Sequence, residues 1–253
     1  MKTRPGVELA SLTDVGCQRE NNEDSYGYWE PAGDADFAEF GRLAIVADGM
    51  GGHEGGQIAS RLAVDTITNA YAEAIDSDPQ QRLRTALRDA HRRIQQCAKQ
   101  DPNLSSMGTT CTALALIDMR LYFVHVGDSR LYLLREGKLH ILSRDHTLIA
   151  RLLDKGLIRP DQAQDHPQKH VLTSALGVAD EEMEIDAPPE PLPLHKNDVL
   201  MICTDGLWGQ METGEIKHAL DSHPPDEACR ALVHLAKERG GPDNITLQVL
   251  RID

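Results

Sequence analysis

Four aspartates in this chain stand close to glycine where an apolar segment begins or ends. They are Asp48, Asp128, Asp205 and Asp243. Asp48 follows the apolar run 43–47, and Asp205 follows a second such run at 199–204. Short apolar runs bounded by turn residues predict buried strands. If these strands share one sheet or one sandwich, we expect the four carboxylates to meet at a common edge.

Four carboxylates at one site would repel one another strongly in a region of low dielectric constant. Shared protons and bound cations are the two physical ways to relieve that repulsion. Ligand sets made only of oxygen favour hard ions such as Mg²⁺ or Mn²⁺ over zinc. The alternative is that the four residues are unrelated turn formers, because Asp-Gly is a common turn dipeptide.

Glycine is concentrated directly after Asp48, at positions 49, 51, 52, 55 and 56. Glycine lets the backbone turn sharply and approach a ligand closely. A P-loop does not fit this stretch, because Gln57 and Ile58 stand where lysine and serine or threonine are required. The Gly-x-Gly-x-x-Gly, His-Glu-x-x-His and Gly-x-Ser-x-Gly motifs are also absent. The carboxylates therefore remain the best candidates for chemistry.

Arg19 is the candidate for holding a substrate anion. A guanidinium can grip a phosphate through paired hydrogen bonds. In the other interpretation, Arg19 is an exposed residue that pairs with its neighbours Glu20 and Glu23.

The composition is that of a soluble globular protein and excludes several classes. The 253 residues are 40% hydrophobic and 26% charged, with a net charge of −14 that argues against a nucleic-acid partner. The five cysteines are odd in number and scattered, so we expect reduced thiols rather than a disulfide framework or a zinc site. No signal peptide or membrane span is recognisable. We therefore expect a cytoplasmic protein with no membrane or nucleic-acid partner.

Strands and amphipathic helices must position these residues. Alternation or apolar runs predict strands at 7–14, 25–29, 42–47, 109–117, 121–126, 130–135, 138–142, 198–203 and 245–252. Apolar residues at helical spacing predict helices at 57–76, 79–99, 212–221 and 225–239. The four strands between 109 and 142 are predicted to form one antiparallel meander, and the acidic segment 31–40 is predicted to be an exposed loop. The arginines of the second helix, at 82, 84, 88, 92 and 93, are interpreted as its solvated face.

Residues 145–180 differ from the rest, with short helical turns, many charges and little apolar content. They are predicted to leave the main body, and 187–193 to be extended because it is rich in proline. No repeat or convincing linker divides the chain, so residues 1–253 are predicted to form a single domain.

Eight short motifs along the chain together resemble those of a known family. The motifs are Arg19-x-x-Asn22-Glu23-Asp24, Asp48-Gly-Met-Gly-Gly, Gly108-Thr109-Thr110, Gly127-Asp128-Ser129-Arg130, Asp145-His146-Thr147, Leu172-Thr-x-Ala-Leu-Gly177, Thr204-Asp205-Gly206-Leu207 and Asp243-Asn244-Ile245-Thr246. Their order and content resemble the metal-dependent PP2C-type (PPM) protein serine/threonine phosphatases in their compact bacterial form. The series runs from residue 19 to 246 and so covers nearly the whole chain.

The resemblance implies an α+β fold, a four-layer α-β-β-α sandwich of two antiparallel sheets flanked by helices. Residues 145–180 would be a flap subdomain beside the metal cleft.

The resemblance also implies a role for each site residue. Asp48 would bridge two Mn²⁺ or Mg²⁺ ions, with the carbonyl of Gly49 on the first. Asp205 and Asp243 would complete the second ion, and Asp24 would act through bound water. Asp128, together with Asp205, would hold a weaker third ion. Arg19 would bind the phosphate. Asn22, Glu23 and Asn244 would support the metal ligands without binding an ion themselves.

The implied reaction is hydrolysis of phosphoserine or phosphothreonine in proteins by a metal-bridging water, with no phosphoenzyme. The chain departs from many family members at Met50, where a histidine is proposed as general acid; His53 or a metal-bound water are alternatives for that acid. It departs from the bacterial pattern at Ser174, where arginine is common. The expected partners are phosphoproteins of a serine/threonine kinase, and the expected state is a monomer.

Two other functions compete with this interpretation. A non-catalytic phosphoprotein-binding module could use the same fold, although its mark would be lost ligands and none is missing. A metal-dependent phosphodiesterase acting on nucleotides is opposed by the acidic charge and by the lack of an aromatic patch for stacking bases.

Overall fold

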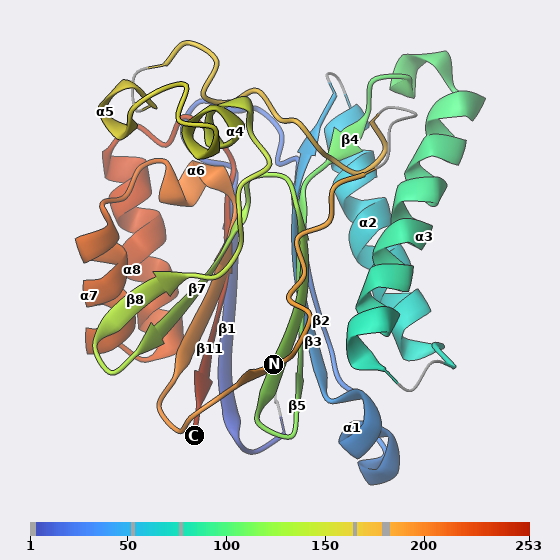
Figure 1. Ribbon diagram of the computed structural model, residues 1–253, viewed down its shortest axis with the longest axis vertical. Coiled ribbons are helices and arrows are strands. Elements are labelled where there is room, and N and C mark those ends of the chain that lie inside the picture. The colour runs from blue at the N-terminus through green and yellow to red at the C-terminus, as the bar shows by residue number, and fades with distance from the viewer. Residues whose placement is uncertain (1–3, 52–53, 76–77, 164–165, 179–182) are drawn as a thin grey trace.

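Two antiparallel sheets packed face to face form the centre of the molecule in the computed structural model (Figure 1). The structure describes residues 4–253 except 52–53, 76–77, 164–165 and 179–182. One sheet has the strand order β1-β11-β10-β7-β8 and the other β2-β3-β5-β6-β9, with β4 paired to β3. The strands are β1 Val7–Asp14, β2 Asp24–Trp29, β3 Arg42–Met50, β4 Gly108–Thr109, β5 Cys111–Ile117, β6 Arg120–Val126, β7 Arg130–Arg135, β8 Lys138–Ile141, β9 Leu192–Pro193, β10 Val199–Cys203 and β11 Ile245–Ile252.

Helices cover the outer face of each sheet. The helices are α1 Asp34–Phe40, α2 Gly55–Ala72, α3 Pro79–Gln100, α4 Leu148–Asp154, α5 Pro160–Ala163, α6 Asp205–Trp208, α7 Thr213–Ser222 and α8 Pro225–Glu238, with a 3₁₀ turn at Pro102–Leu104. Figure 1 shows α2 and α3 beside the sheet that contains β2 and β3, and α7 and α8 beside the sheet that contains β1 and β11. The predicted four-layer α+β sandwich is therefore confirmed.

Three apolar clusters hold these layers together. One lies between α2, α3 and their sheet, one between α7, α8 and theirs, and the third between the two sheets. The helices bury the apolar face that their spacing predicts: Ala59, Ala63 and Ile67 of α2 are fully buried. All five cysteines are free thiols, as predicted. Among the described residues, no helix is both long and apolar enough to cross a membrane.

The predicted four-stranded meander is wrong, because its strands divide between the two sheets. β5 and β6 pair in one sheet, whereas β7 and β8 pair in the other. The chain crosses between them at Gly127–Ser129, where Gly127 has a φ of +105° that glycine adopts readily. Asp128 consequently lies at a crossover between the two sheets.

The strand predicted at 42–47 continues as β3 to Met50, so Asp48 lies inside a strand and not at its end. The reason is a second partner: beyond the pairing with β5, Gly49 and Met50 pair with Thr109 and Gly108 of β4. This extension places Asp48 directly opposite Asp24 of β2 in the register.

Two other predictions are wrong for a shared reason. The segment predicted as loop 31–40 contains α1, and Arg82, predicted to be on a solvated helix face, is 1% exposed. The Arg82 guanidinium donates to the Glu39 carboxylate at 2.7 Å and lies 4.3 Å from the ring centroid of Phe40. The two features stabilise each other, because α1 supplies the carboxylate and the ring that a buried guanidinium needs.

Residues 145–163, 166–178 and 183–186 lie outside the strands of the two sheets. Their helices α4 and α5 stand above α6 at one end of the sandwich in Figure 1. Short bridges tie this segment to the body, with Leu176 paired to Thr109 and Asp186 paired to His125.

Candidate metal and phosphate site

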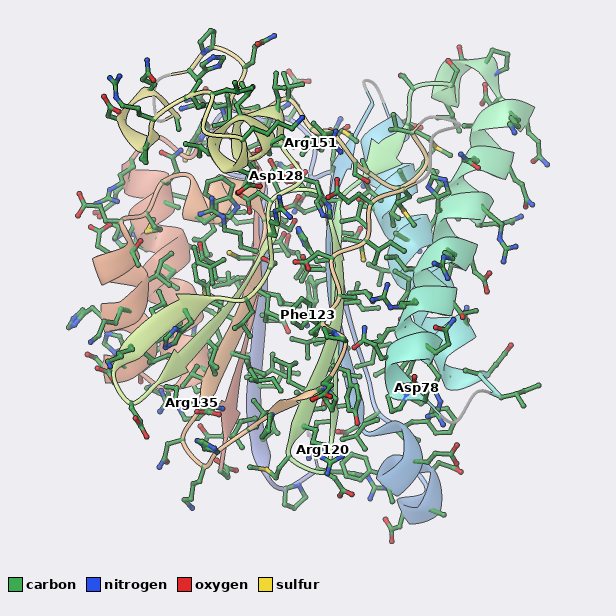
Figure 2. All side chains as sticks on the ribbon, viewed as in Figure 1. Asp78, Arg120, Phe123, Asp128, Arg135 and Arg151 are labelled. Atoms are coloured by element: carbon green, nitrogen blue, oxygen red, sulfur yellow. The ribbon has the colours of Figure 1, made fainter. Side chains whose placement is uncertain are left out.

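The four aspartates singled out from the sequence line one cavity of about 450 Å³. Asp48 comes from one sheet, Asp205 and Asp243 flank strands of the other, and Asp128 lies at the crossover between them. Figure 2 shows Asp128 and Arg151 at one end of the sandwich and Arg120 and Arg135 at the opposite end. Arg19, on the loop after β1, lines the same cavity. The structure thus brings these four carboxylates and Arg19 to the lining of one cavity.

Asp24 lies opposite the cavity residue Asp48 in the strand register, does not itself line the cavity, and is 8% exposed. Its Oδ2 accepts a hydrogen bond from the Thr204 hydroxyl at 2.9 Å. Its Oδ1 is buried and accepts no hydrogen bond from the part of the chain that the structure describes. A buried carboxylate oxygen of this kind is costly unless a proton or a cation satisfies it.

The pKa values of three carboxyl groups are raised for related reasons. Burial, followed by the nearby charges of Asp205 and Asp243, raises the pKa of Asp24 to about 7. Burial, together with Asp205 and Asp145, raises the pKa of Asp128 to about 8. The pKa of Asp48 lies well above its ordinary value because of burial and the repulsion of the surrounding aspartates. Such a cluster favours bound positive charge.

The carboxylates surround the cavity without meeting at one point. Among the residues that the structure describes, no three histidine, cysteine, aspartate or glutamate side chains form a ready-made coordination group. The Asp243 carboxylate accepts a hydrogen bond from Arg19 Nη2 at 2.8 Å, and Asp205 Oδ2 lies 3.7 Å from His170 Nδ1. The donor set of charged oxygens, the orphaned Asp24 oxygen and the raised pKa values nevertheless fit hard divalent ions.

Close backbone contact holds the loops of Asp205 and Asp243 together. A Cβ atom on Gly206 would lie 1.9 Å from the carbonyl oxygen of Asn244, so the position requires glycine. The Asn244 amide donates to the carbonyls of Val15 and Asn21 at 3.0 and 2.9 Å. These contacts explain Asp205-Gly206 as a close approach between chain segments, not as a simple turn.

The residues predicted to support the ligands connect the loops of the site. The Asn22 side chain accepts from the backbone N–H of Asp24 at 3.1 Å and donates to Thr13 at 2.8 Å. The backbone N–H of Glu23 donates to Asn244 Oδ1 at 2.7 Å, and its carbonyl accepts from Gly49 N–H at 3.2 Å. Burial raises the pKa of the Glu23 carboxyl, which also lines the cavity.

Two threonines to which the sequence assigned no role hold the backbone of Asp48. The Thr110 hydroxyl accepts from Asp48 N–H at 3.0 Å and contacts the Ser129 hydroxyl at 2.8 Å. The Thr109 hydroxyl donates to the Asp48 carbonyl at 2.8 Å. Their motif, Gly108-Thr109-Thr110, was the available signal, but only the tertiary contacts show what the hydroxyls do.

His170 is a cavity residue that sequence reasoning missed. It comes from the segment that follows β8, and the neighbouring Asp205 carboxylate raises its pKa. Met50 lines the cavity as well, whereas His53 lies outside the described residues. Ser174, the other departure from the family pattern, exchanges hydrogen bonds with the backbone of Glu184 and is absent from the cavity lining.

The chain is similar to known phosphatases over nearly its whole length. A family model described as protein phosphatase 2C matches residues 18–240. Protein phosphatase PhpP of Streptococcus pneumoniae serotype 2 is 35% identical over 252 residues, which are 98% of each chain. The serine/threonine phosphatase of S. agalactiae superimposes with a TM-score of 0.87 at 32% identity, over 98% of this chain and 100% of that one. The catalytic domain of serine/threonine protein phosphatase PstP was solved in complex with 2 manganese ions. It superimposes on this chain with a TM-score of 0.82 at 32% identity, over 98% of this chain and 99% of that one.

Proposed function

We propose, from the premise that this chain belongs to the protein phosphatase 2C family of metal-dependent serine/threonine protein phosphatases, that its carboxylate-lined cavity is the site of hydrolysis. Asp48 would bridge two ions, with the carbonyl of Gly49 as a ligand of the first. Asp205 and Asp243 would hold the second, and Asp24 would act through water. The observation that carries this assignment is the convergence of the carboxylates from two sheets on one cavity.

Mn²⁺ or Mg²⁺ is the proposed resident ion, because every side-chain donor of the set is a carboxylate oxygen. The PstP structure with manganese supports the same choice. Asp128, together with Asp205, would hold a third and weaker ion. The chemistry that such ions supply when bound is activation of a water and neutralisation of charge on a phosphoryl group.

Arg19 is the proposed phosphate-binding residue. Its side chain is 51% exposed at the cavity and lies on the same loop as the residues that support Asp24. Its hydrogen bond with Asp243 raises its pKa, so the guanidinium stays charged at any working pH. A fork of N–H donors beside the carboxylates can orient a phosphoryl group for in-line attack and offset its charge.

The substrates proposed are phosphoserine and phosphothreonine proteins of a serine/threonine kinase pathway, with residues 145–180 as a flap beside the cavity. His170 and Leu172 of that segment line the cavity, which supports a role in substrate access. The five free thiols support action in the cytoplasm. The protein would act as a monomer.

The decisive experiment measures phosphate release from a phosphothreonine peptide with Mn²⁺, with Mg²⁺ and with a chelator. We expect turnover with the added ions and none with the chelator. A cyclic dinucleotide serves as the comparison substrate, and we expect its hydrolysis to be much slower than that of the peptide. Preference for the dinucleotide, or peptide turnover that survives complete metal removal, would contradict the proposal.

Replacing Arg19 with alanine is expected to lower kcat/KM for the phosphopeptide by about a hundredfold, because one charged donor to the phosphoryl oxygens is lost. Mn²⁺ binding should persist, since no ligand is removed. Arg61→Ala is the matched control: Arg61 lies on α2 with an 81% exposed side chain and should tolerate the change. Steady-state kinetics and a Mn²⁺ titration of both variants check this; equal activity in the two variants would rule out the role of Arg19.

A further inference from the structure

Trp208 connects the two aspartates that are proposed to share the weaker ion. The helix α6 is one turn long, beginning at Asp205 and ending at Trp208. The indole Nε1–H of Trp208 donates a hydrogen bond to the backbone carbonyl of Asp128 at 2.9 Å. A single side chain therefore joins the turn that carries Asp205 to the crossover loop that carries Asp128.

An arginine holds the indole in this position. The Arg130 guanidinium carbon lies 3.5 Å from the centroid of the Trp208 ring, which is a close cation–π contact. The same guanidinium makes a two-pronged ion pair with Asp145, with Nη2 to Oδ2 at 2.8 Å and Nε to Oδ1 at 3.1 Å. Arg130 and Asp145 are both largely buried, with side chains 22% and 17% exposed. Ring and guanidinium thus have little freedom to move.

The contacts among Trp208, Arg130 and Asp145 connect three separate segments of the chain. Arg130 lies two positions after Asp128, and Asp145 begins the 145–180 segment. The indole, the guanidinium and the Asp145 carboxylate form a continuous chain of contacts from α6 to that segment. A change in the separation of Asp128 and Asp205 would have to break the indole hydrogen bond or slide the ring from under Arg130.

We propose that Trp208 is a positioning residue that fixes the separation of Asp128 and Asp205 and thereby sets the affinity of the ion they share. This inference rests on the proposed site. It goes further by assigning a function to a residue that contacts no ion, and by linking the weak ion to the 145–180 segment through Arg130 and Asp145. Ordinary packing alone would need the indole ring but not its N–H.

The first test replaces Trp208 with phenylalanine, which keeps a ring under Arg130 and removes the N–H. Free Mn²⁺ is measured by electron paramagnetic resonance during a titration of the protein. We expect the tightly held ions to bind as in the unchanged protein and the weakest ion to bind about fivefold less tightly, the factor that corresponds to one ordinary hydrogen bond. Trp29→Phe is the control, because Trp29 packs against Phe40 and Tyr71 within the apolar layers.

Activity gives a second readout that a purely structural role would not produce. For Trp208→Phe, the Mn²⁺ concentration that gives half-maximal turnover should rise, and turnover at saturating Mn²⁺ should return to that of the Trp29→Phe control. A lower turnover that excess Mn²⁺ does not restore, at unchanged Mn²⁺ affinity, would overturn the proposal.

The second test does not require any change at Trp208. Trp29→Phe leaves Trp208 as the only tryptophan, since the chain has two. Paramagnetic Mn²⁺ should then quench the fluorescence of Trp208, and the midpoint of this quenching should equal the Mn²⁺ concentration at which the weakest ion half-saturates. The quenching should exceed any change that diamagnetic Mg²⁺ causes. Absence of that quenching would overturn the proposal. The proposed function itself fails separately, if the unchanged protein binds no Mn²⁺ or if Asp48→Asn binds it equally well.

Discussion

Replacing Asp48 with asparagine is expected to reduce turnover of a phosphothreonine peptide by at least about a thousandfold. Asp48 lines the cavity and lies opposite Asp24 of the neighbouring strand β2. It is the proposed bridge between two ions. An amide carries no negative charge and cannot bridge two cations as a carboxylate does. The loss should therefore appear in kcat and should not be recovered by raising the substrate concentration.

The same substitution is expected to leave the metal-free protein as stable as before, or more stable. Burial and the neighbouring aspartates oppose the ionised form of Asp48, which is why its pKa lies well above the ordinary value. A neutral side chain of the same shape removes this repulsion. Activity and stability should thus change in different directions, as expected where a protein stores electrostatic strain at a functional site.

Thermal unfolding in the presence of a chelator, beside steady-state kinetics with Mn²⁺, measures both effects. The matched control is Asp65→Asn on α2, where the aspartate side chain is 65% exposed and pairs with Arg61 at 3.9 Å. That variant should keep its activity and its midpoint of unfolding. If Asp48→Asn lost stability in proportion to its activity, Asp48 would be a structural residue and not the bridging ligand.

The second large effect concerns pH: the metal-free protein is expected to lose stability as the pH rises from 6.5 to 8.0. The pKa values of Asp24 and Asp128 are about 7 and about 8 in the folded state, against an ordinary value of 3.8. The folded state therefore retains protons in this range that the unfolded state has already released. Stability falls with pH wherever the folded state binds more protons. Integrating these two shifts gives a loss on the order of 2 kcal/mol.

The chosen range separates the carboxylates from other groups. The pKa values of His125 and His146 are lowered by burial, so both imidazoles are neutral in the folded state above pH 6.5. The stability that these two imidazoles contribute increases as the pH rises and is complete about one pH unit above their ordinary pKa of 6.5, so within the range it offsets only a part of the fall expected from the carboxylates. The ordinary pKa of cysteine, 9.0, lies above the range from pH 6.5 to 8.0, and burial raises the pKa of Cys111 and Cys203 further. Both thiols therefore stay protonated in the folded state.

Urea unfolding at pH 6.5 and 8.0, with chelator and with Mn²⁺, checks the prediction. With Mn²⁺ the fall should disappear or reverse, because metal ions bind the ionised carboxylates and bind them more tightly at higher pH. Asp128→Asn should reduce the fall in the chelated protein by removing one of the titrating groups. Stability that rises with pH in the chelated protein would show that these carboxyl groups are ionised when folded.

The sequence by itself was enough to single out the carboxylates of the proposed site. Asp48, Asp205 and Asp243 could be singled out because a carboxylate beside a buried strand and a glycine is costly and therefore conspicuous. Periodicity also predicted the paired helices and most strands, because a side chain that alternates between core and solvent records its burial locally. The family resemblance then implied the sandwich, which the structure confirms.

The tertiary structure alone decided which distant residues meet. Asp24 faces Asp48 in the register, and the hydroxyl on its Oδ2 belongs to Thr204, 180 residues further along the chain. Arg82 is buried only because α1 forms beside it. The hydrogen bond from the Trp208 indole to the Asp128 carbonyl depends on the crossover between the two sheets, and no local sequence pattern predicts it. Local pattern records whether a residue is buried, but sheet order and strand register determine its neighbours, and those are set by packing across the whole chain.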